Sequence, residues 1–170
     1  MITYEIAHEF FSYKDGILYW KKLNSNNQVK IGDEAGCVNT GGYKVVFFLG
    51  KRLRIHRIIY LMFNGFVPKQ IDHIDGNTLN NKIENLRSAS HSENMQNKCI
   101  QKNNTSGVKG VFWEKYAKKW RAQIKVDNKK IYLGLFLNLK EAEQIILEAR
   151  KKYHGEFAKH QTRLGDAVGI

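Results

Sequence analysis

The sequence lacks the features that mark membrane, secreted and zinc-stabilised proteins. None of its apolar runs reaches the ~18 residues of a membrane-spanning helix, and its first residues have neither the basic start nor the apolar stretch of a signal peptide. Its two cysteines, Cys37 and Cys99, have no partner at the spacing of a zinc site or a disulfide framework. We therefore expect a cytoplasmic protein without a membrane partner, in which both thiols pack as small apolar side chains.

Acidic residues are also scarce. The chain has 16 Asp and Glu against 28 Lys and Arg, a formal net charge of +12, and the basic residues recur along its length. Cations distributed in this way bind a polyanion by releasing counterions from its phosphates, and the affinity falls as salt rises. The charge favours a nucleic acid as the partner, and a merely soluble basic protein is the alternative.

The N-terminal region, residues 1–66, has the pattern of β-hairpins followed by a helix. Asp15 and Gly16 separate two aromatic-rich runs, which is a strong signal for a hairpin turn. Residues 43–55 predict a second pair of strands joined at a glycine. Apolar residues at helical spacing follow, and Gly65 near their end suits a helix stop.

The next segment, residues 67–101, is polar and rich in asparagine. It contains the adjacent pair Asp72 and His73 before an Asp-Gly-Asn loop. A carboxylate is a hard oxygen ligand for magnesium, and a neutral imidazole with a pKa near ~6.5 can take a proton from water. Such a pair before a turn is, by itself, more often a structural cap than a catalytic pair.

A helix is predicted to begin near His91, because Ser90 and Glu93 have the spacing of a capping box. His91 and Asn94 would then share a face of this helix, one turn apart. Phosphodiester cleavage needs an activated water, an ion that neutralises charge, and groups that hold both in line. The polar residues of the loop and of this helix face are the candidates for these tasks.

The spacing of the whole segment resembles the HNH endonuclease motif of phage homing enzymes. It reads IDHIDGN over residues 71–77, IENLR over residues 83–87 and HSEN over residues 91–94. The resemblance implies a ββα-metal unit, in which two strands and a helix surround one divalent ion, magnesium or alternatively manganese. It also implies site-specific hydrolysis of double-stranded DNA to 5′-phosphate and 3′-hydroxyl ends, by a phage enzyme in the cytoplasm of its host.

The same resemblance assigns a role to each motif residue. His73 would be the general base that activates water, and Asp72 would ligate the metal. Asn85 would brace the loop and keep the base oriented. Asn94 would be the second metal ligand, where many family members have histidine, and its neutral amide oxygen suits magnesium or manganese better than zinc. His91 is the rival ligand, and we favour it as a phosphate contact or a helper of the leaving group.

Basic residues near this motif are candidates for DNA contacts. Arg52, Arg54 and Arg57 belong to a run that alternates cations with apolar residues, as on a strand with one buried face, and Arg87 lies within the motif. An exposed basic face beside a nuclease motif would clamp the DNA backbone. A solvated strand face without a partner explains the first three residues equally well.

The last segment, residues 102–160, resembles the Apetala-type (ethylene-response-factor) DNA-binding domain. It reads GVKGVFW over residues 107–113, KWRAQI over residues 119–124 and YLGLF over residues 132–136, and a helix is predicted after it. The resemblance implies a three-stranded antiparallel sheet packed on one helix, with the sheet in the major groove. The DNA contacts carried over by position are Lys109, Trp113, Arg121, Gln123 and Lys125. Val111 replaces a base-reading arginine of the plant proteins, so their sequence preference is not implied.

Together these patterns predict an α+β protein that cuts or nicks DNA, as a monomer or weak dimer without an obligate protein partner. Residues 102–107 are the candidate linker, and residues 161–170 are predicted to be a flexible tail. The alternative function is a non-catalytic, sequence-specific DNA-binding regulator. RNA binding is a weaker third possibility, because no RNP-like or KH-like motif supports it.

Overall fold

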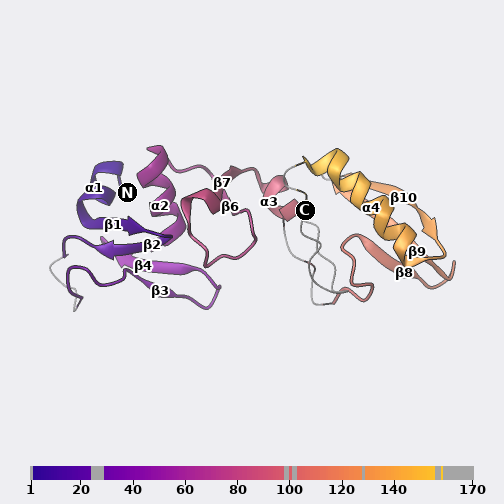
Figure 1. Ribbon diagram of the computed structural model, residues 1–170, viewed down its shortest axis with the longest axis horizontal. Coiled ribbons are helices and arrows are strands. Elements are labelled where there is room, and N and C mark those ends of the chain that lie inside the picture. Colours follow the sequence, from indigo (N-terminus) through magenta and orange to yellow (C-terminus); the bar gives the residue numbers. More distant parts are fainter. Residues whose placement is uncertain are drawn as a thin grey trace. The chain divides into compact units, whose positions relative to one another are not determined.

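The computed structural model describes residues 2–23, 29–97, 100, 103–127, 129–155 and 158. The chain divides into two compact units, Met1–Ala89 and Ser90–Ile170 (Figure 1). Cys99 and the predicted flexible tail, residues 161–170, lie outside the described residues. None of the helices described is both long and apolar enough to cross a membrane.

The described residues form four α-helices, one short 3-10 helix and four small antiparallel sheets. This confirms the predicted α+β class.

The first unit begins with a short helix and a hairpin. The elements are α1 (Tyr4–Phe10), β1 (Phe11–Lys14) and β2 (Ile17–Trp20). The turn between the strands uses Asp15 and Gly16, both with positive φ, which confirms the hairpin predicted at this dipeptide. Helix α1 has no counterpart in the sequence prediction; the side chain of Thr3 caps it by accepting a hydrogen bond from the amide of Ile6.

A three-stranded sheet and a helix follow the hairpin. The elements are β3 (Cys37–Val38), β4 (Lys44–Phe48), β5 (Lys51–Arg54) and α2 (Ile55–Asn64). The sheet order is β3-β4-β5, so β3 and β5 are its edge strands. Gly65 ends α2 in the left-handed conformation, as predicted. The prediction that Cys37 packs as a buried thiol is wrong, because β3 is an exposed edge strand.

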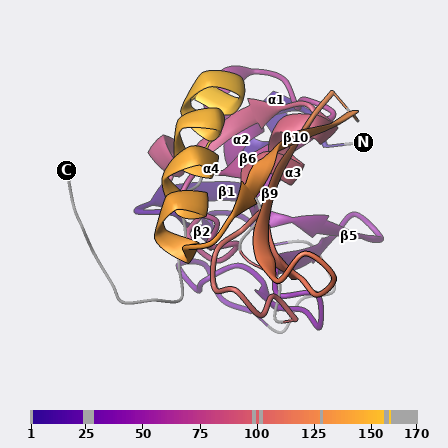
Figure 2. The ribbon, with the colours of Figure 1, turned by 90° about the vertical axis from the view of Figure 1, so that its right-hand side faces the viewer.

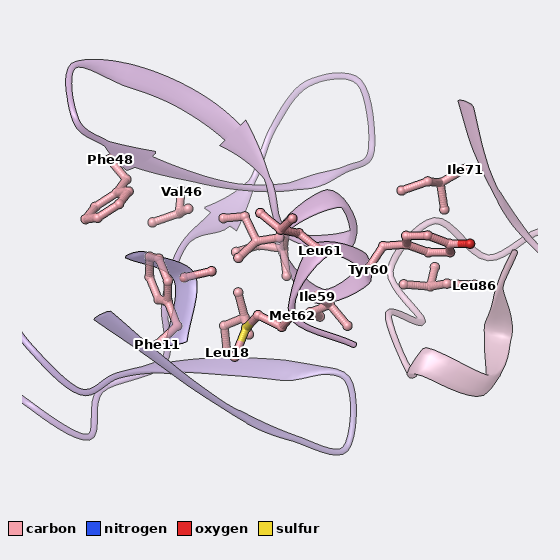
Figure 3. Close-up of a cluster of buried hydrophobic side chains, with 14 of the residues drawn as sticks. Phe11, Leu18, Val46, Phe48, Ile59, Tyr60, Leu61, Met62, Ile71 and Leu86 are labelled. Carbon is pink, nitrogen blue, oxygen red and sulfur yellow. The ribbon is translucent and has the colours of Figure 1, made fainter. Parts of the chain in front are cut away.

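The core of the first unit joins the hairpin, the sheet and α2 (Figure 3). Phe11 and Phe48 lie at one end of the cluster, and Tyr60 of α2 lies beside Ile71 and Leu86 at the other. Each fully buried side chain of this size contributes about 1.5–3 kcal/mol of burial free energy. Ile71 and Leu86 belong to the strands that carry the motif, so the core holds these strands in place.

Those strands are β6 (Gln70–His73) and β7 (Leu86–Ala89), which pair as a two-stranded antiparallel ribbon. A long polar loop connects them and ends in the 3-10 helix η1 (Ile83–Asn85). The third motif element, α3 (His91–Asn97), belongs to the second unit. Its predicted capping box is confirmed, because Ser90 Oγ accepts from the amide of Glu93 and the Glu93 carboxylate accepts from the amide of Ser90.

The rest of the second unit is a three-stranded sheet with one helix packed on it (Figure 2). The elements are β8 (Val111–Glu114), β9 (Lys119–Val126), β10 (Lys129–Phe136) and α4 (Leu139–His154), with sheet order β10-β9-β8. Val111, Ala122 and Ile124 of the sheet pack with Ala142 and Ile146 of α4. The architecture is the one expected for this segment.

The candidate linker contains ordered turns. Ser106 is buried, and its Oγ lies 2.9 Å from the carbonyl oxygen of Val108 and 2.6 Å from that of Val111. The amide of Gly107 donates to the side-chain oxygen of Asn104 at 2.8 Å. These side chains satisfy backbone groups at the start of the sheet, as Asn and Ser commonly do in turns.

Candidate functional site

Strand β6 ends with the two residues that the motif places at the centre of the chemistry. Asp72 is 4% exposed and His73 is 5% exposed. Successive side chains of a strand point to opposite faces, and the pairing of β6 with β7 puts Asp72 opposite Arg87 and His73 opposite Leu86. The two buried polar side chains therefore have different neighbours.

The carboxylate of Asp72 forms an ion pair with Arg87. Its Oδ2 lies 3.0 Å from Nε and 2.9 Å from Nη2 of the guanidinium. A buried carboxylate needs such compensation, because its transfer from water to the interior costs several kcal/mol. The structure thus places Arg87, a predicted DNA contact, on the carboxylate that the motif assigns to the metal.

The imidazole of His73 lies in a small polar and aromatic cluster. Its Nε2 is 3.0 Å from Oδ1 of Asn81. The ring of His56 meets it edge to face, with centroids 5.1 Å apart, and the ring of Tyr43 lies 6.4 Å away. The motif in the sequence gives no role to Asn81, His56 or Tyr43. The loop contains several asparagines, and nothing in the sequence shows that Asn81 is the buried one.

The histidine behind His73 is uncharged at neutral pH. Burial, and to a lesser extent the charges of His73, Arg54 and Arg57, together lower the pKa of His56 from 6.5 to about 3. A neutral His56 can pack against His73 without adding a positive charge to the cluster.

The loop between β6 and β7 is closed by its own amide side chains. Asn85 Oδ1 accepts from the amide of Asp75 at 2.9 Å, and Asn85 Nδ2 donates to Asp75 Oδ1 at 2.9 Å and to the carbonyl oxygen of Asn80 at 2.8 Å. Burial raises the pKa of Asp75, but hydrogen bonds from Asn80, Asn77 and Asn85 outweigh it, so the pKa is lowered. The side chain of Asn85 thus makes its hydrogen bonds to the loop.

The two remaining motif residues lie on α3. His91 is exposed and Asn94 is half-buried. The backbone amide of Asn94 donates to the backbone carbonyl oxygen of Ser90. Within the described residues, no three His, Cys, Asp or Glu side chains gather as a metal-binding group. The donor set predicted from the motif is one carboxylate and one amide oxygen. That set fits magnesium, which keeps water and substrate phosphate among its ligands.

Two of the predicted basic residues of the first unit lie on the edge strand β5. Arg52 and Arg54 pair with Phe47 and Val45 of β4, on one face of the sheet. The guanidinium of Arg54 lies 4.4 Å from the centre of the Tyr43 ring. Tyr43 in turn contacts His56 and His73. Its ring therefore connects the exposed Arg54 with the two buried histidines.

Arg57 lies on α2 rather than on the strand, because the helix begins at Ile55. Its Nη2 donates to the carbonyl oxygen of Pro68 at 3.2 Å. The alternating run that the sequence suggested therefore ends at Arg54, and the basic residues are shared between a strand and a helix.

In the second unit, β9 separates core residues from the predicted DNA contacts. Arg121, Gln123 and Lys125 alternate with Ala122 and Ile124, which pack against α4. The three polar side chains therefore lie on the face of the sheet away from the helix.

The guanidinium of Arg121 is held between aromatic rings of the two neighbouring strands. It lies 5.7 Å from the ring centre of Phe112 on β8 and 5.3 Å from that of Tyr132 on β10. Glu114 approaches the same guanidinium at 3.6 Å. Stacking on both sides restricts the side chain, whose Nε is buried without a hydrogen-bond partner among the described residues.

Trp113 has a different environment from Arg121. It is 43% exposed and packs edge to face on Trp120, with ring centroids 5.0 Å apart. Trp120 belongs to the core between the sheet and α4. The structure therefore places Trp113 on the opposite face of the sheet from Arg121, Gln123 and Lys125.

Lys109 lies at the rim of a basic cavity of the second unit. Its Nζ donates to the carbonyl oxygen of Gln96 near the end of α3, at 2.7 Å. The cavity has a volume of about 720 Å³, and no Asp or Glu lines it. Its cationic and imidazole lining residues are His91, Lys109, Lys125, Lys130, Arg150 and His154.

Comparisons with known proteins cover the motif and much of the chain. A family model described as HNH endonuclease matches residues 53–96. Protein 3.8 of Escherichia phage T7 is 39% identical over 111 residues, which are 64% of this chain and 91% of that protein. An uncharacterized HNH endonuclease of Acanthamoeba polyphaga mimivirus is 42% identical over 78 residues, 44% of this chain and 41% of that protein. No solved structure matches the chain.

Proposed function

The chain belongs to the HNH endonucleases, and we propose that it is a metal-dependent, site-specific endonuclease of the homing type that acts on double-stranded DNA. The observation that carries this proposal is the buried pair Asp72 and His73 at the end of β6, inside the segment that the family model matches. The proposed reaction is hydrolysis of a phosphodiester bond to 5′-phosphate and 3′-hydroxyl ends.

In this proposal each motif residue has one task. His73 takes the proton of the attacking water. Asp72 and Asn94 hold a divalent ion, magnesium or manganese, which when bound neutralises charge on the phosphate and the departing oxygen. His91 contacts the phosphate or assists the leaving group. Asn85 keeps the loop closed, and its hydrogen bonds to Asp75 and Asn80 support that role.

DNA contacts near the catalytic centre are proposed for the basic residues of the first unit. Arg52, Arg54 and Arg57 would bind backbone phosphates, because phosphate contacts position a protein on DNA without reading its sequence. Arg54 contacts Tyr43, and Tyr43 contacts His73, so a phosphate bound by Arg54 would lie near the proposed catalytic histidine. Arg87 would act chiefly by compensating the charge of Asp72.

The second unit is proposed to dock on DNA as an Apetala-type module does. Its sheet of three strands with one helix on the inner face supports this comparison. Arg121, Gln123 and Lys125 on the outer face are the central contacts, with Lys109 and Trp113 at the margin. The outer face carries cations and aromatic rings together, which suits a groove-binding surface.

One catalytic centre cuts one strand, so we propose a nicking monomer or a weak dimer that cuts both strands, without an obligate protein partner. The activity would take place in the cytoplasm of a host cell. Nick mapping on the DNA that flanks the gene would identify the target and show whether one or both strands are cut.

The decisive test is strand cleavage of a plasmid that carries this flanking DNA. Wild type with magnesium should nick it, and EDTA should abolish the activity. His73→Ala should reduce the rate by about 10²–10⁴-fold, which is the usual contribution of a general base. His8→Ala, a histidine on α1 that is bonded to the carbonyl of Met62, is the matched control. Equal rates for wild type and His73→Ala would refute the mechanism.

A non-catalytic DNA-binding regulator is the second candidate function. The observation that favours it is the ion pair of Asp72 with Arg87. Such a buried ion pair can be purely structural, with the arginine in place of a metal ion as the partner of the carboxylate. The two candidates differ in one measurement: a regulator binds the flanking DNA equally well with and without magnesium and does not nick it.

A further inference from the structure

The second unit contains a cavity of about 720 Å³ to which the motif assigns no task. It lies at the edge of the sheet where β9 continues past its last pair with β8, the pair of Ala122 and Val111, and residues of α3 and α4 also line it. We propose that this cavity binds phosphate groups of the DNA backbone, with Lys125 and Lys130 as the contacts. This inference rests on the proposed binding of the second unit to DNA.

The lining of the cavity carries charge of one sign. Four of its side chains are cations, and none of the described residues that line it is an Asp or Glu. The cations are Lys109, Lys125, Lys130 and Arg150. Burial lowers the pKa of Arg150 to about 10, so its guanidinium is still charged at neutral pH. The cavity therefore attracts anions.

Apolar side chains strengthen this attraction. Met95 of α3, Ile124 of β9 and Ile146 of α4 line the cavity together with the cations. A cleft with charges of one sign and walls of low dielectric constant focuses the electric field and raises the local concentration of the opposite ion. The volume is within the range of about 300–1,000 Å³ that is usual for binding sites.

Hydrogen bonds to backbone carbonyls hold the walls of the cavity together. Nζ of Lys109 donates to the carbonyl oxygen of Gln96 at 2.7 Å, and Nη2 of Arg150 donates to the carbonyl oxygen of Lys109 at 2.6 Å. Nε2 of His154 lies 3.1 Å from the carbonyl oxygen of Lys125. These bonds connect α3, the start of the sheet and α4. We therefore assign Lys109 and Arg150 to the framework of the cavity and the phosphate contacts to its exposed lysines.

The two exposed lysines lie directly opposite each other. Lys125 of β9 and Lys130 of β10 are Cα partners in the antiparallel register. Like charges at such a pair of positions destabilise a sheet. A phosphate bound between the two ammonium groups would offset this cost, because each ammonium can donate to a different phosphate oxygen. The pair is thus better suited to the bound state than to the free one.

The position of the cavity favours DNA over a free phosphate compound. Gln123 and Lys125 belong both to the cavity and to the outer face of the sheet, which is proposed to dock on DNA. A duplex on that face would have its backbone beside the cavity while its bases meet Arg121. Contacts of this kind fix the register of a protein on DNA and carry no sequence information.

The test is binding of the full chain to a labelled duplex in EDTA, which prevents cleavage, measured by fluorescence anisotropy over a range of salt concentrations. The duplex carries the DNA that flanks the gene. Lys130→Gln should weaken binding by about 2–10-fold. It should also lower the slope of log binding constant against log salt by about 1, since one phosphate contact is lost. A duplex of scrambled sequence should show the same change in slope.

Lys129→Gln is the matched control. Lys129 precedes Lys130 on β10 and is also exposed, but it does not line the cavity. Its variant should keep the salt slope of the wild type. Because both lysines are exposed, neither substitution should unfold the chain, which thermal unfolding checks. A slope that the two variants lower equally, or that neither of them changes, would overturn the proposal.

Backbone amide shifts separate DNA from a free ligand of the same chemistry. Gly110 and Gln123 line the cavity, and their amide signals report on its occupation. The duplex should shift them at concentrations far below those at which inorganic phosphate or a deoxynucleoside monophosphate does so. An equal or stronger effect of the monophosphate would show that the cavity is a site for a free nucleotide and would refute the DNA contact.

The outcomes also distinguish this inference from the proposed function. If Lys130→Gln lowers the salt slope but the wild type does not nick the plasmid, the phosphate contact stands and the nuclease function fails. If the wild type nicks the plasmid but Lys130→Gln and Lys129→Gln have the same salt slope, the nuclease function stands and the phosphate contact fails.

Discussion

The ion pair of Asp72 with Arg87 has to satisfy two requirements of the Asp72 carboxylate. A carboxylate that is to bind a metal ion must keep its charge, and a buried charge must be compensated while the protein folds. Arg87 provides this compensation, since its side chain is only 15% exposed and its guanidinium contacts Oδ2 through two nitrogens. A bound cation could take over part of this compensation.

Removal of Arg87 should therefore destabilise the metal-free chain strongly. We expect Arg87→Ala to lose about 3 kcal/mol of unfolding free energy, because it leaves an uncompensated buried carboxylate. Added magnesium should recover part of the loss. The measurement is urea unfolding with and without magnesium. Asp72→Asn/Arg87→Met, which removes both charges, is the control and should lie closer to wild type. A loss in Arg87→Ala that magnesium leaves unchanged would argue against Asp72 as a metal ligand.

His56 should make the folded state sensitive to acid. Its pKa is about 3 in the folded chain and 6.5 in its ordinary environment. Above pH 6.5 both states are neutral and the stability is unaffected. Below this pH the unfolded chain takes up a proton that the folded chain does not, so stability falls by about 1.4 kcal/mol per pH unit until the folded pKa is reached.

The check is the pH dependence of the unfolding free energy for wild type and His56→Leu. The variant should lose less stability between about pH 6.5 and pH 5 than the wild type. Equal slopes for the two proteins in this range would show that His56 is protonated in the folded state.

At the scale of elements, the N-terminal hairpin and the motif loop depend on each other. Gly16 has a φ of 84° and its Cα faces the backbone of Lys82. Gly50, in the turn between β4 and β5, has a similar φ of 73° but nothing within 4 Å of a Cβ. A Cβ at Gly16 would collide with the backbone of Lys82, whereas a Cβ at Gly50 would meet nothing. Both glycines have the same left-handed backbone conformation.

Substitution of these glycines by alanine should separate the two effects. Both variants should lose about 1–2 kcal/mol through the left-handed conformation. Gly16→Ala should lose more, and it should also slow strand cleavage because the collision displaces the backbone at Asn81. Thermal unfolding and nicking rates are the measurements. Equal stability and equal activity of the two variants would show that the hairpin does not position the loop.

The outer face of the C-terminal sheet provides a test of docking. Arg121→Ala should weaken binding to the target DNA by about 1–3 kcal/mol if the arginine contacts a base edge, and Arg121→Lys should not restore it. Trp113→Phe should weaken binding less than Arg121→Ala, because Trp113 packs on Trp120 at the other side of the sheet. Binding isotherms at one salt concentration decide this. A larger loss of affinity for Trp113→Phe than for Arg121→Ala would mean that the DNA binds the opposite face of the sheet and would refute this docking.

Local signals in the sequence predicted several elements correctly. The Asp15-Gly16 turn, the end of α2 at Gly65 and the capping box of α3 each depend on residues that are close in the chain. The contact of Asn81 with His73 could not be predicted in this way. It depends on the path of a loop that contains several similar asparagines, and the loop is shaped by a hairpin some 65 residues earlier, as the contact of Gly16 with Lys82 shows.

One further miss has a simple physical cause. Helix α1 was not predicted, because its seven residues are too few to give a clear apolar period. Trp113 was grouped with Arg121 because a family resemblance transfers positions in the sequence, whereas the face of a strand follows from alternation. The metal ligands proposed for this chain lie in two different units, Asp72 in the first and Asn94 in the second. Local signals in the sequence predict each of these two residues separately.

At the scale of the whole molecule, the net charge of +12 should dominate affinity for DNA. If about six to ten phosphates are contacted, the binding constant should fall by roughly 10³–10⁵ between about 50 and 200 mM salt. Fluorescence anisotropy with a labelled duplex measures this. An affinity that does not change over this range would contradict a phosphate-dominated interface.

The cations of strand β5 affect how copies of the protein meet each other. β5 is an edge strand, and its open backbone is a template on which another chain could pair. Lys51, Arg52 and Arg54 place three like charges along its four residues, so a second copy is repelled before its strand can align. Variants in which these cations are replaced by neutral residues would lose this repulsion as well as the phosphate contacts. Their tendency to self-associate should therefore rise as their affinity for DNA falls.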